Sequence, residues 1–165
     1  MKHEILNATQ IQQKLKRMAY QIYENNFQAS EIVFVGLQGA GYTLATKLRQ
    51  EFVAIAPIAT TLGQVFIDKA QPTRQEVTLD LSAEALHDKT VIVVDDVLYT
   101  GRTLIYSLKP FLKAKIFKLQ TAVLIQRNHR LFPIATDYVG YSLATTLQEH
   151  ILVTLEGEQV GVYMS

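Results

Sequence analysis

Short, strongly apolar runs recur along this chain, and they limit its fold more than any other feature. They cover residues 32–35, 91–94 and 119–125. Each run lacks the polar alternation of a strand with one wet face, so each is predicted to be a strand buried on both faces. Helical patterns lie between the runs. Strands that alternate with helices predict an α/β fold with a mainly parallel sheet and right-handed crossovers.

The amphipathic stretch of residues 8–26 is the clearest predicted helix. Ile11, Leu15, Met18 and Ile22 recur at spacings of three and four, and Thr9 is a candidate N-cap. Further helices are predicted over residues 42–51 and from about residue 102. Additional strands are predicted over the following segments: residues 53–58, 64–67, 77–81 and 151–155. The alternation weakens after residue 128, which predicts an antiparallel edge or a small subdomain in the last third.

Composition restricts the function classes. The 165 residues fit a single domain spanning 1–165, and 48% apolar residues are enough for a core. A net charge of +1 gives no global attraction to nucleic acid or anionic lipid. The chain has no cysteine, and its four histidines show no metal-ligand spacing. It shows no apolar signal core and no membrane-length apolar run, so a cytoplasmic protein without membrane contact is expected.

Residues 91–103 carry the strongest chemical signal. A buried strand delivers two adjacent carboxylates, Asp95 and Asp96, to its C-terminal end, which is where open α/β sheets bind ligands. A turn containing Thr100, Gly101 and Thr103 then opens a helix and offers hydroxyl and free N–H groups to an anion. One alternative is an acidic pair that only caps a helix. Carboxylates beside an anion cradle instead suit a phosphorylated sugar, and we favour that interpretation.

The apolar strand, acid pair and Thr-Gly-x-Thr turn resemble the motif with which type I phosphoribosyltransferases bind 5-phosphoribosyl-1-pyrophosphate (PRPP). The resemblance implies that Asp95 and Asp96 hold the ribose hydroxyls and act in catalysis. It implies that the 5-phosphate is bound by the following turn: Tyr99, Thr100, Gly101, Arg102 and Thr103. It also implies the type I fold, a twisted parallel sheet flanked by helices with a small hood, and Mg²⁺ carried in with PRPP, with help from the two carboxylates.

A narrower resemblance, covering most of the chain, is to the pyrimidine operon attenuation protein/uracil phosphoribosyltransferase family. It is carried by the form of residues 95–103 and by the segments 122–130 and 137–140. Purine-salvage members often have an aspartate where this chain has Tyr99, so the resemblance implies a pyrimidine base. The expected reaction is uracil plus PRPP giving UMP and pyrophosphate.

Two loops depart from the pattern of that family: the first loop differs in sequence, and the second is shorter. The first loop, expected to bind pyrophosphate, reads Gln38, Gly39, Ala40 and Gly41, where the family has Lys-Thr-Arg-Gly. Two cations are therefore missing, and a plain strand-to-helix turn is an equal alternative. The polar stretch 68–75 stands at the family's mobile catalytic loop. Lys69 and Arg74 are its candidate cations for the leaving pyrophosphate, with an ordinary solvated loop slightly favoured.

Binding of RNA is the family's second activity. Arg127, His129 and Arg130 are candidate contacts to base or RNA, but Tyr20 and Tyr141 replace an expected histidine and lysine. RNA binding is therefore not favoured. The family implies a homodimer or larger homo-oligomer. Two alternatives stay open: an enzyme for another base, and a PRPP- or nucleotide-sensing regulator with weak or no turnover.

Overall fold

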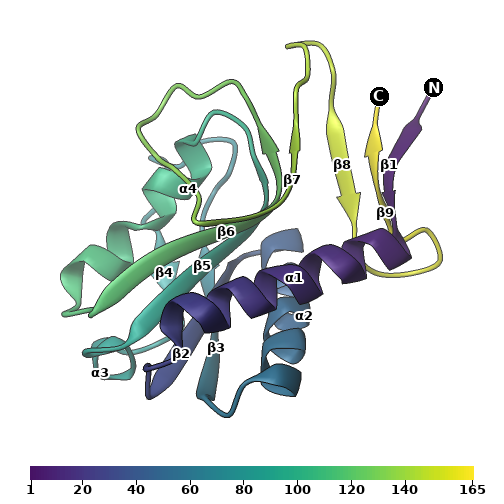
Figure 1. Ribbon diagram of the computed structural model, residues 1–165. Helices are drawn as coiled ribbons and strands as arrows, with labels where there is room; N and C mark the ends of the chain where they lie inside the picture. Colours follow the sequence, from purple (N-terminus) through teal and green to yellow (C-terminus); the bar gives the residue numbers. More distant parts are fainter.

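Six strands form the larger of two sheets in the computed structural model, which describes residues 1–165 (Figure 1). Their order is β4-β3-β2-β5-β6-β7, parallel throughout except for β4. The strands are β2 (Glu31–Leu37), β3 (Ala59–Phe66), β4 (Thr78–Leu79), β5 (Thr90–Leu98), β6 (Lys118–Arg127) and β7 (Tyr138–Leu143). The predicted mainly parallel α/β sheet is confirmed.

Alternate residues of the central strands point into two separate cores. Phe34, Ile92 and Leu124 face α1 (Ala8–Asn26) and α2 (Ala40–Ile55). Val35 and Val93 face the core on the opposite side of the sheet. That side is covered by α3 (Ala83–Leu86), α4 (Arg102–Ser107) and the 3₁₀ helix η1 (Lys109–Lys113). Because both faces are covered, the central strands read as continuous apolar runs.

The first helix has the predicted length but a different cap. Its N-cap is Asn7, whose side chain accepts a hydrogen bond from the Gln10 backbone N–H, while the Gln10 side chain accepts one from the Asn7 N–H. This reciprocal capping box places Thr9 inside the first turn. The prediction of Thr9 as the cap was therefore wrong.

The strand predicted over residues 53–58 is also wrong. Helix α2 continues to Ile55, and β3 begins only at Ala59. Phe52 is buried in the core beneath α2, so the helical face continues past the predicted end at residue 51. The apolar character of residues 53–58 reflects the last turn of this helix and the connection to β3.

A second, three-stranded antiparallel sheet forms a hood beside the carboxyl ends of the parallel strands. Its order is β1 (His3–Asn7), β9 (Gly161–Met164) and β8 (Ile151–Thr154), and the two chain termini lie near each other at its tip (Figure 1). The prediction of a small additional region in the last third is confirmed. The strand predicted at 151–155 belongs to this hood and not to the parallel sheet. None of the helices has the length and apolar character needed to cross a membrane.

Candidate functional site

The sheet reverses its strand order between β2 and β5. From β2 the chain proceeds outward to β3 on one side, and from β5 it proceeds outward to β6 and β7 on the other. The connections after β2 and β5 therefore diverge to opposite faces and leave a crevice at the carboxyl ends of these strands. Such topological switch points are where open α/β sheets bind ligands. The first loop follows β2, and the acid pair lies near the end of β5.

Asp95 and Asp96 differ in their access to water. The Asp95 side chain is only 4% exposed, whereas that of Asp96 is 20% exposed. Asp95 Oδ1 accepts a hydrogen bond of 2.9 Å from the Asp96 backbone N–H. Burial, followed by the charge on Asp96, raises the pKa of Asp95 to about 7. The acid pair thus joins one carboxylate that is costly to ionise with one that faces the crevice.

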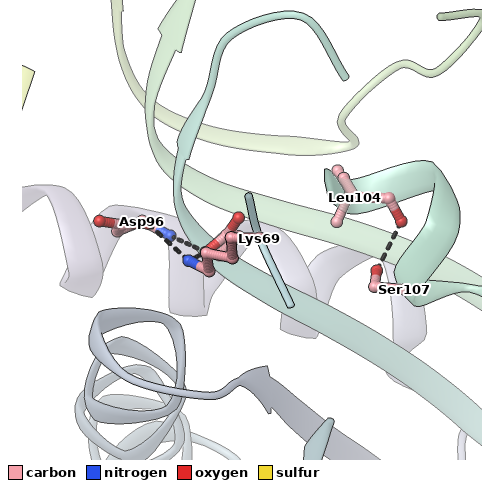
Figure 2. Close-up of polar contacts among 5 residues, drawn as sticks. Lys69, Asp96, Leu104 and Ser107 are labelled. Carbon is pink, nitrogen blue, oxygen red and sulfur yellow. Dashed lines mark hydrogen bonds and ion pairs between the residues drawn. The ribbon is translucent and has the colours of Figure 1, made fainter. Parts of the chain in front are cut away.

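Lys69 supplies the positive charge nearest to the acid pair. Its Nζ lies 3.0 Å from Asp95 Oδ1 and 3.7 Å from Asp96 Oδ1, and the side chain reaches over from the polar stretch after β3 (Figure 2). Burial alone would lower the pKa of Lys69, but the two negative charges outweigh it and raise that pKa. The ammonium in turn opposes the rise of the Asp95 pKa. Lys69 therefore occupies one oxygen atom of each carboxylate.

The turn after β5, residues 99–103, has the geometry of an anion cradle. Gly101 has φ +86°, and a Cβ there would come within 2.5 Å of the Ile134 side chain, so the position requires glycine. The backbone N–H groups of Thr100, Gly101 and Thr103 donate no hydrogen bond within the protein. A pocket of about 140 Å³ is lined by Asp95 together with residues 97–104. We call residues 99–103 the phosphate loop.

Helix α4 and the segment after β6 support the phosphate loop. Ser107 donates a hydrogen bond to the Leu104 carbonyl oxygen near the end of α4 (Figure 2). The Thr100 carbonyl oxygen accepts from the N–H groups of Leu131 and Phe132 at 2.9 and 3.1 Å. The Thr100 contacts therefore tie the phosphate loop to the segment after β6, and the Ser107 bond stabilises the helix that follows the loop.

The first loop lies directly against the acid pair. A Cβ on Gly41 would come within 3.0 Å of Asp95 Oδ1 and of the Val94 carbonyl oxygen, so any larger residue would press on the buried carboxylate. The N–H groups of Gly39, Ala40 and Gly41 donate no hydrogen bond within the protein, and the Gln38 side chain is exposed. The loop therefore presents backbone donors and no side-chain cation.

The remaining predicted residues lie in different settings. Arg74 is exposed in a turn and makes no side-chain contact with the acid pair. Arg102 and Arg130 are exposed, whereas Arg127 is buried and His129 is half-buried beside Tyr99. Sequence reasoning named Lys69 as a loop cation but missed its contact with Asp95. That contact joins residues 26 positions apart, and no local pattern signals it.

The donor atoms of the site fit Mg²⁺ only in part. No group of three histidine, cysteine, aspartate or glutamate side chains converges to hold a metal ion. The acid pair does offer carboxylate oxygens, the ligands that Mg²⁺ prefers. These residues fit an ion whose other ligands come from a phosphorylated substrate.

Comparisons with known proteins agree with this geometry. The model of the family described as phosphoribosyl transferase domain matches residues 1–155. The fold is similar to that of the hypoxanthine phosphoribosyltransferase of Trypanosoma cruzi, with a TM-score of 0.79 at 15% identity over 98% of this chain and 94% of the other. A hypoxanthine-guanine phosphoribosyltransferase from Bacillus anthracis gives a TM-score of 0.74 at 24% identity, covering 91% of this chain and 85% of that enzyme. The fold and the site define a type I phosphoribosyltransferase.

Sequence relatives narrow this class. The bifunctional protein PyrR of Limosilactobacillus fermentum is 34% identical over 166 residues, covering 94% of this chain and 92% of the relative. The bifunctional protein PyrR of Clostridium acetobutylicum is 34% identical over 174 residues, covering 99% and 98%. The chain belongs to the phosphoribosyltransferase family, within its group of bifunctional PyrR proteins.

The raised pKa of Asp95 predicts how stability depends on pH. An unfolded aspartate titrates near 3.8, so ionisation costs folded stability progressively from about pH 4 until it is complete above about pH 7. Asp95→Asn removes this cost while keeping the side-chain oxygen. The variant should melt several degrees above the wild type at pH 8, with the difference shrinking toward pH 4, as followed by calorimetry.

The exposed Asp88, just before the amino end of β5, provides the control. Asp88→Asn should show no such gain at pH 8, because that carboxylate already lies in water. If Asp95→Asn destabilises the protein equally at both pH values, ionisation of Asp95 does not lower the stability of the folded protein.

Proposed function

We propose that this protein transfers the 5-phosphoribosyl group from PRPP to uracil, releasing pyrophosphate. The proposal depends on one observation above all: the acid pair and a phosphate loop with free N–H groups meet at the switch point of a phosphoribosyltransferase fold. The acid pair, which would bind the ribose hydroxyls, and the phosphate loop, which would bind the 5-phosphate, are then only a few residues apart, as binding of one ribose 5-phosphate requires.

In the proposed reaction, the bond from the anomeric carbon to the pyrophosphate oxygen breaks and a bond to uracil N1 forms. The N1 proton passes to water, and positive charge builds on the ribose in the transition state. Ionised Asp95 and Asp96 accept hydrogen bonds from the ribose hydroxyls and stabilise that charge. The N–H groups of Thr100, Gly101 and Thr103, with the two threonine hydroxyls, hold the 5-phosphate and orient the sugar.

The leaving pyrophosphate is the part of the substrate that needs the most positive charge. The first loop offers only the N–H groups of residues 39–41. Lys69, displaced from the acid pair by the ribose, is the nearest ammonium able to turn toward the pyrophosphate, and Arg74 is a second candidate on the same stretch. Mg²⁺ bound with PRPP, with Asp95 and Asp96 as its candidate protein ligands, would neutralise further phosphate charge.

Tyr99 supports a pyrimidine over a purine. It lies at the end of the phosphate loop where purine-salvage relatives often carry an aspartate, and its ring is held between Arg127 and His129. A bulky ring in this position reduces the space beside the ribose site, which suits a single-ring base.

A second candidate function is a PRPP- or nucleotide-sensing regulator with little turnover. It is favoured by one observation, the lack of any side-chain cation in the first loop. An RNA-binding role is less favoured, because Arg127 is buried and its Nε and Nη2 already donate hydrogen bonds within the protein.

The direct test mixes purified protein, Mg²⁺ and PRPP with uracil, cytosine, hypoxanthine and guanine, and follows nucleotide formation. UMP should form from uracil, and the double variant Asp95→Asn/Asp96→Asn should lose at least about a hundredfold in rate, since it no longer stabilises the ribose cation. The folded state of the variant is checked by its melting curve. Binding of PRPP without product from any base would support the sensor instead, and IMP or GMP as the main product would refute the pyrimidine assignment.

Lys69 should control the pH dependence of the site. Lys69→Met removes the charge that opposes the rise of the Asp95 pKa, so the pH at which PRPP binding becomes strong should move upward. Turnover should fall about tenfold to a thousandfold through loss of a charge near the leaving group. Lys69→Arg keeps the charge and serves as the control. Binding and turnover profiles of Lys69→Met that match the wild type at every pH would exclude this role.

A further inference from the structure

Arg127 makes an unusual set of contacts at the end of β6. It is 5% exposed. Its Nε donates to Thr145 Oγ1 at 2.7 Å, and its Nη2 donates to the carbonyl oxygens of Thr146 and Glu149 at 3.1 and 2.7 Å. All three acceptors belong to the connection between β7 and β8, residues 144–150, which we call the β7–β8 loop. One side chain therefore makes three of the hydrogen bonds that anchor this loop. The others come from the His129 ring and from the backbone pair of His150 with Ser165.

The same guanidinium also contacts the phosphate loop. Its Cζ lies 4.0 Å from the centroid of the Tyr99 ring, within the range of a cation–π contact. His129 approaches that ring edge-on at a centroid distance of 5.4 Å, and its Nε2 donates to the Thr145 carbonyl oxygen at 2.5 Å. Tyr99, Arg127 and His129 thus form a continuous link between the phosphate loop and the β7–β8 loop.

The charge on Arg127 has no acidic partner. None of the six ion pairs of the protein includes it, and Glu149 contributes only its backbone oxygen. A buried charge without a counter-ion is expensive, and neutral acceptors compensate it only in part. Arginine is suited to this place because its planar guanidinium can stack on a ring while it donates along its edge. A purely structural anchor would not require this charge next to a loop built for an anion.

We infer that Arg127 is a positioning residue that couples the phosphate loop to the β7–β8 loop. An anionic ligand bound in the phosphate loop then orders the β7–β8 loop. This inference rests on the proposed function for the identity of the ligand, PRPP. The β7–β8 loop, which Arg127 already anchors, is then held more firmly when the phosphorylated sugar is in place. Such coupling requires that Arg127 contact both loops at once, which it does.

The test is amide hydrogen exchange of the full chain, with and without PRPP and Mg²⁺. In Arg127→Met, exchange should speed about tenfold or more in residues 144–150 and at the amides that donate hydrogen bonds to Thr100 of the phosphate loop, because each loop loses its link to the other. These amides are the Arg102 N–H, which donates to Thr100 Oγ1, and the Leu131 and Phe132 N–H groups, which donate to the Thr100 carbonyl oxygen. PRPP should slow exchange of residues 144–150 in the wild type but not in Arg127→Met. Arg127→Lys, which keeps the charge but not the three-way hydrogen bonding, should behave as Arg127→Met does in the β7–β8 loop.

Arg49 provides a matched control. Its Nε donates to Thr60 Oγ1 at 2.8 Å, the same kind of bond, at the opposite edge of the sheet. Arg49→Met should leave exchange in both loops and its response to PRPP unchanged. Faster exchange in residues 144–150 alone, with the amides that donate to Thr100 unaffected, would reduce Arg127 to a local anchor and overturn the inference. If the wild type binds no PRPP, the proposed function fails, and the ligand-free comparison of the two loops still decides the coupling.

Discussion

Asp95 is almost entirely removed from water, and the surroundings of the candidate site follow from the cost of that burial. A buried carboxylate needs donors or a cation close by, and here it has the Asp96 N–H and the Lys69 ammonium. Gly41 brings the first loop within van der Waals contact of the same side chain. The two loops and the acid pair are therefore held together around one poorly solvated charge. A ribose hydroxyl that replaces Lys69 would meet acceptors already fixed in position.

The strand order explains why these parts meet at all. Because the connections after β2 and β5 leave the sheet on opposite sides, neither covers the crevice between them. Backbone N–H groups line it from residues 39–41 on one side and from residues 100–103 on the other. In the proposed function, these two groups of N–H donors bind the two anionic ends of PRPP, and the acid pair between them binds the ribose hydroxyls. The site has few side-chain cations, so Lys69 supplies an unusually large part of its positive charge.

Features encoded in contiguous residues could be predicted, and features that depend on distant contacts could not. The central strands, the acid pair and the phosphate loop each lie within a short segment, so local sequence patterns predict them. Asn7 escaped notice as a cap because Thr9, two residues later, is also a favoured capping residue. Strand β1 is a short edge strand of the hood and β9 is its short central strand, and the pairing that joins them links the two ends of the chain. The burial of Arg127 was not predicted either, since a basic residue between polar neighbours reads as a surface contact.

The central claim is that one sugar phosphate spans the acid pair and the phosphate loop, and a crystal structure with bound UMP tests it most directly. The account predicts the 5-phosphate at the N–H groups of Thr100, Gly101 and Thr103. It also predicts the ribose hydroxyls on Asp95 and Asp96, with the Lys69 ammonium moved away from both carboxylates. A phosphate bound elsewhere, or a ribose that leaves the contact between Lys69 and Asp95 intact, would contradict the account.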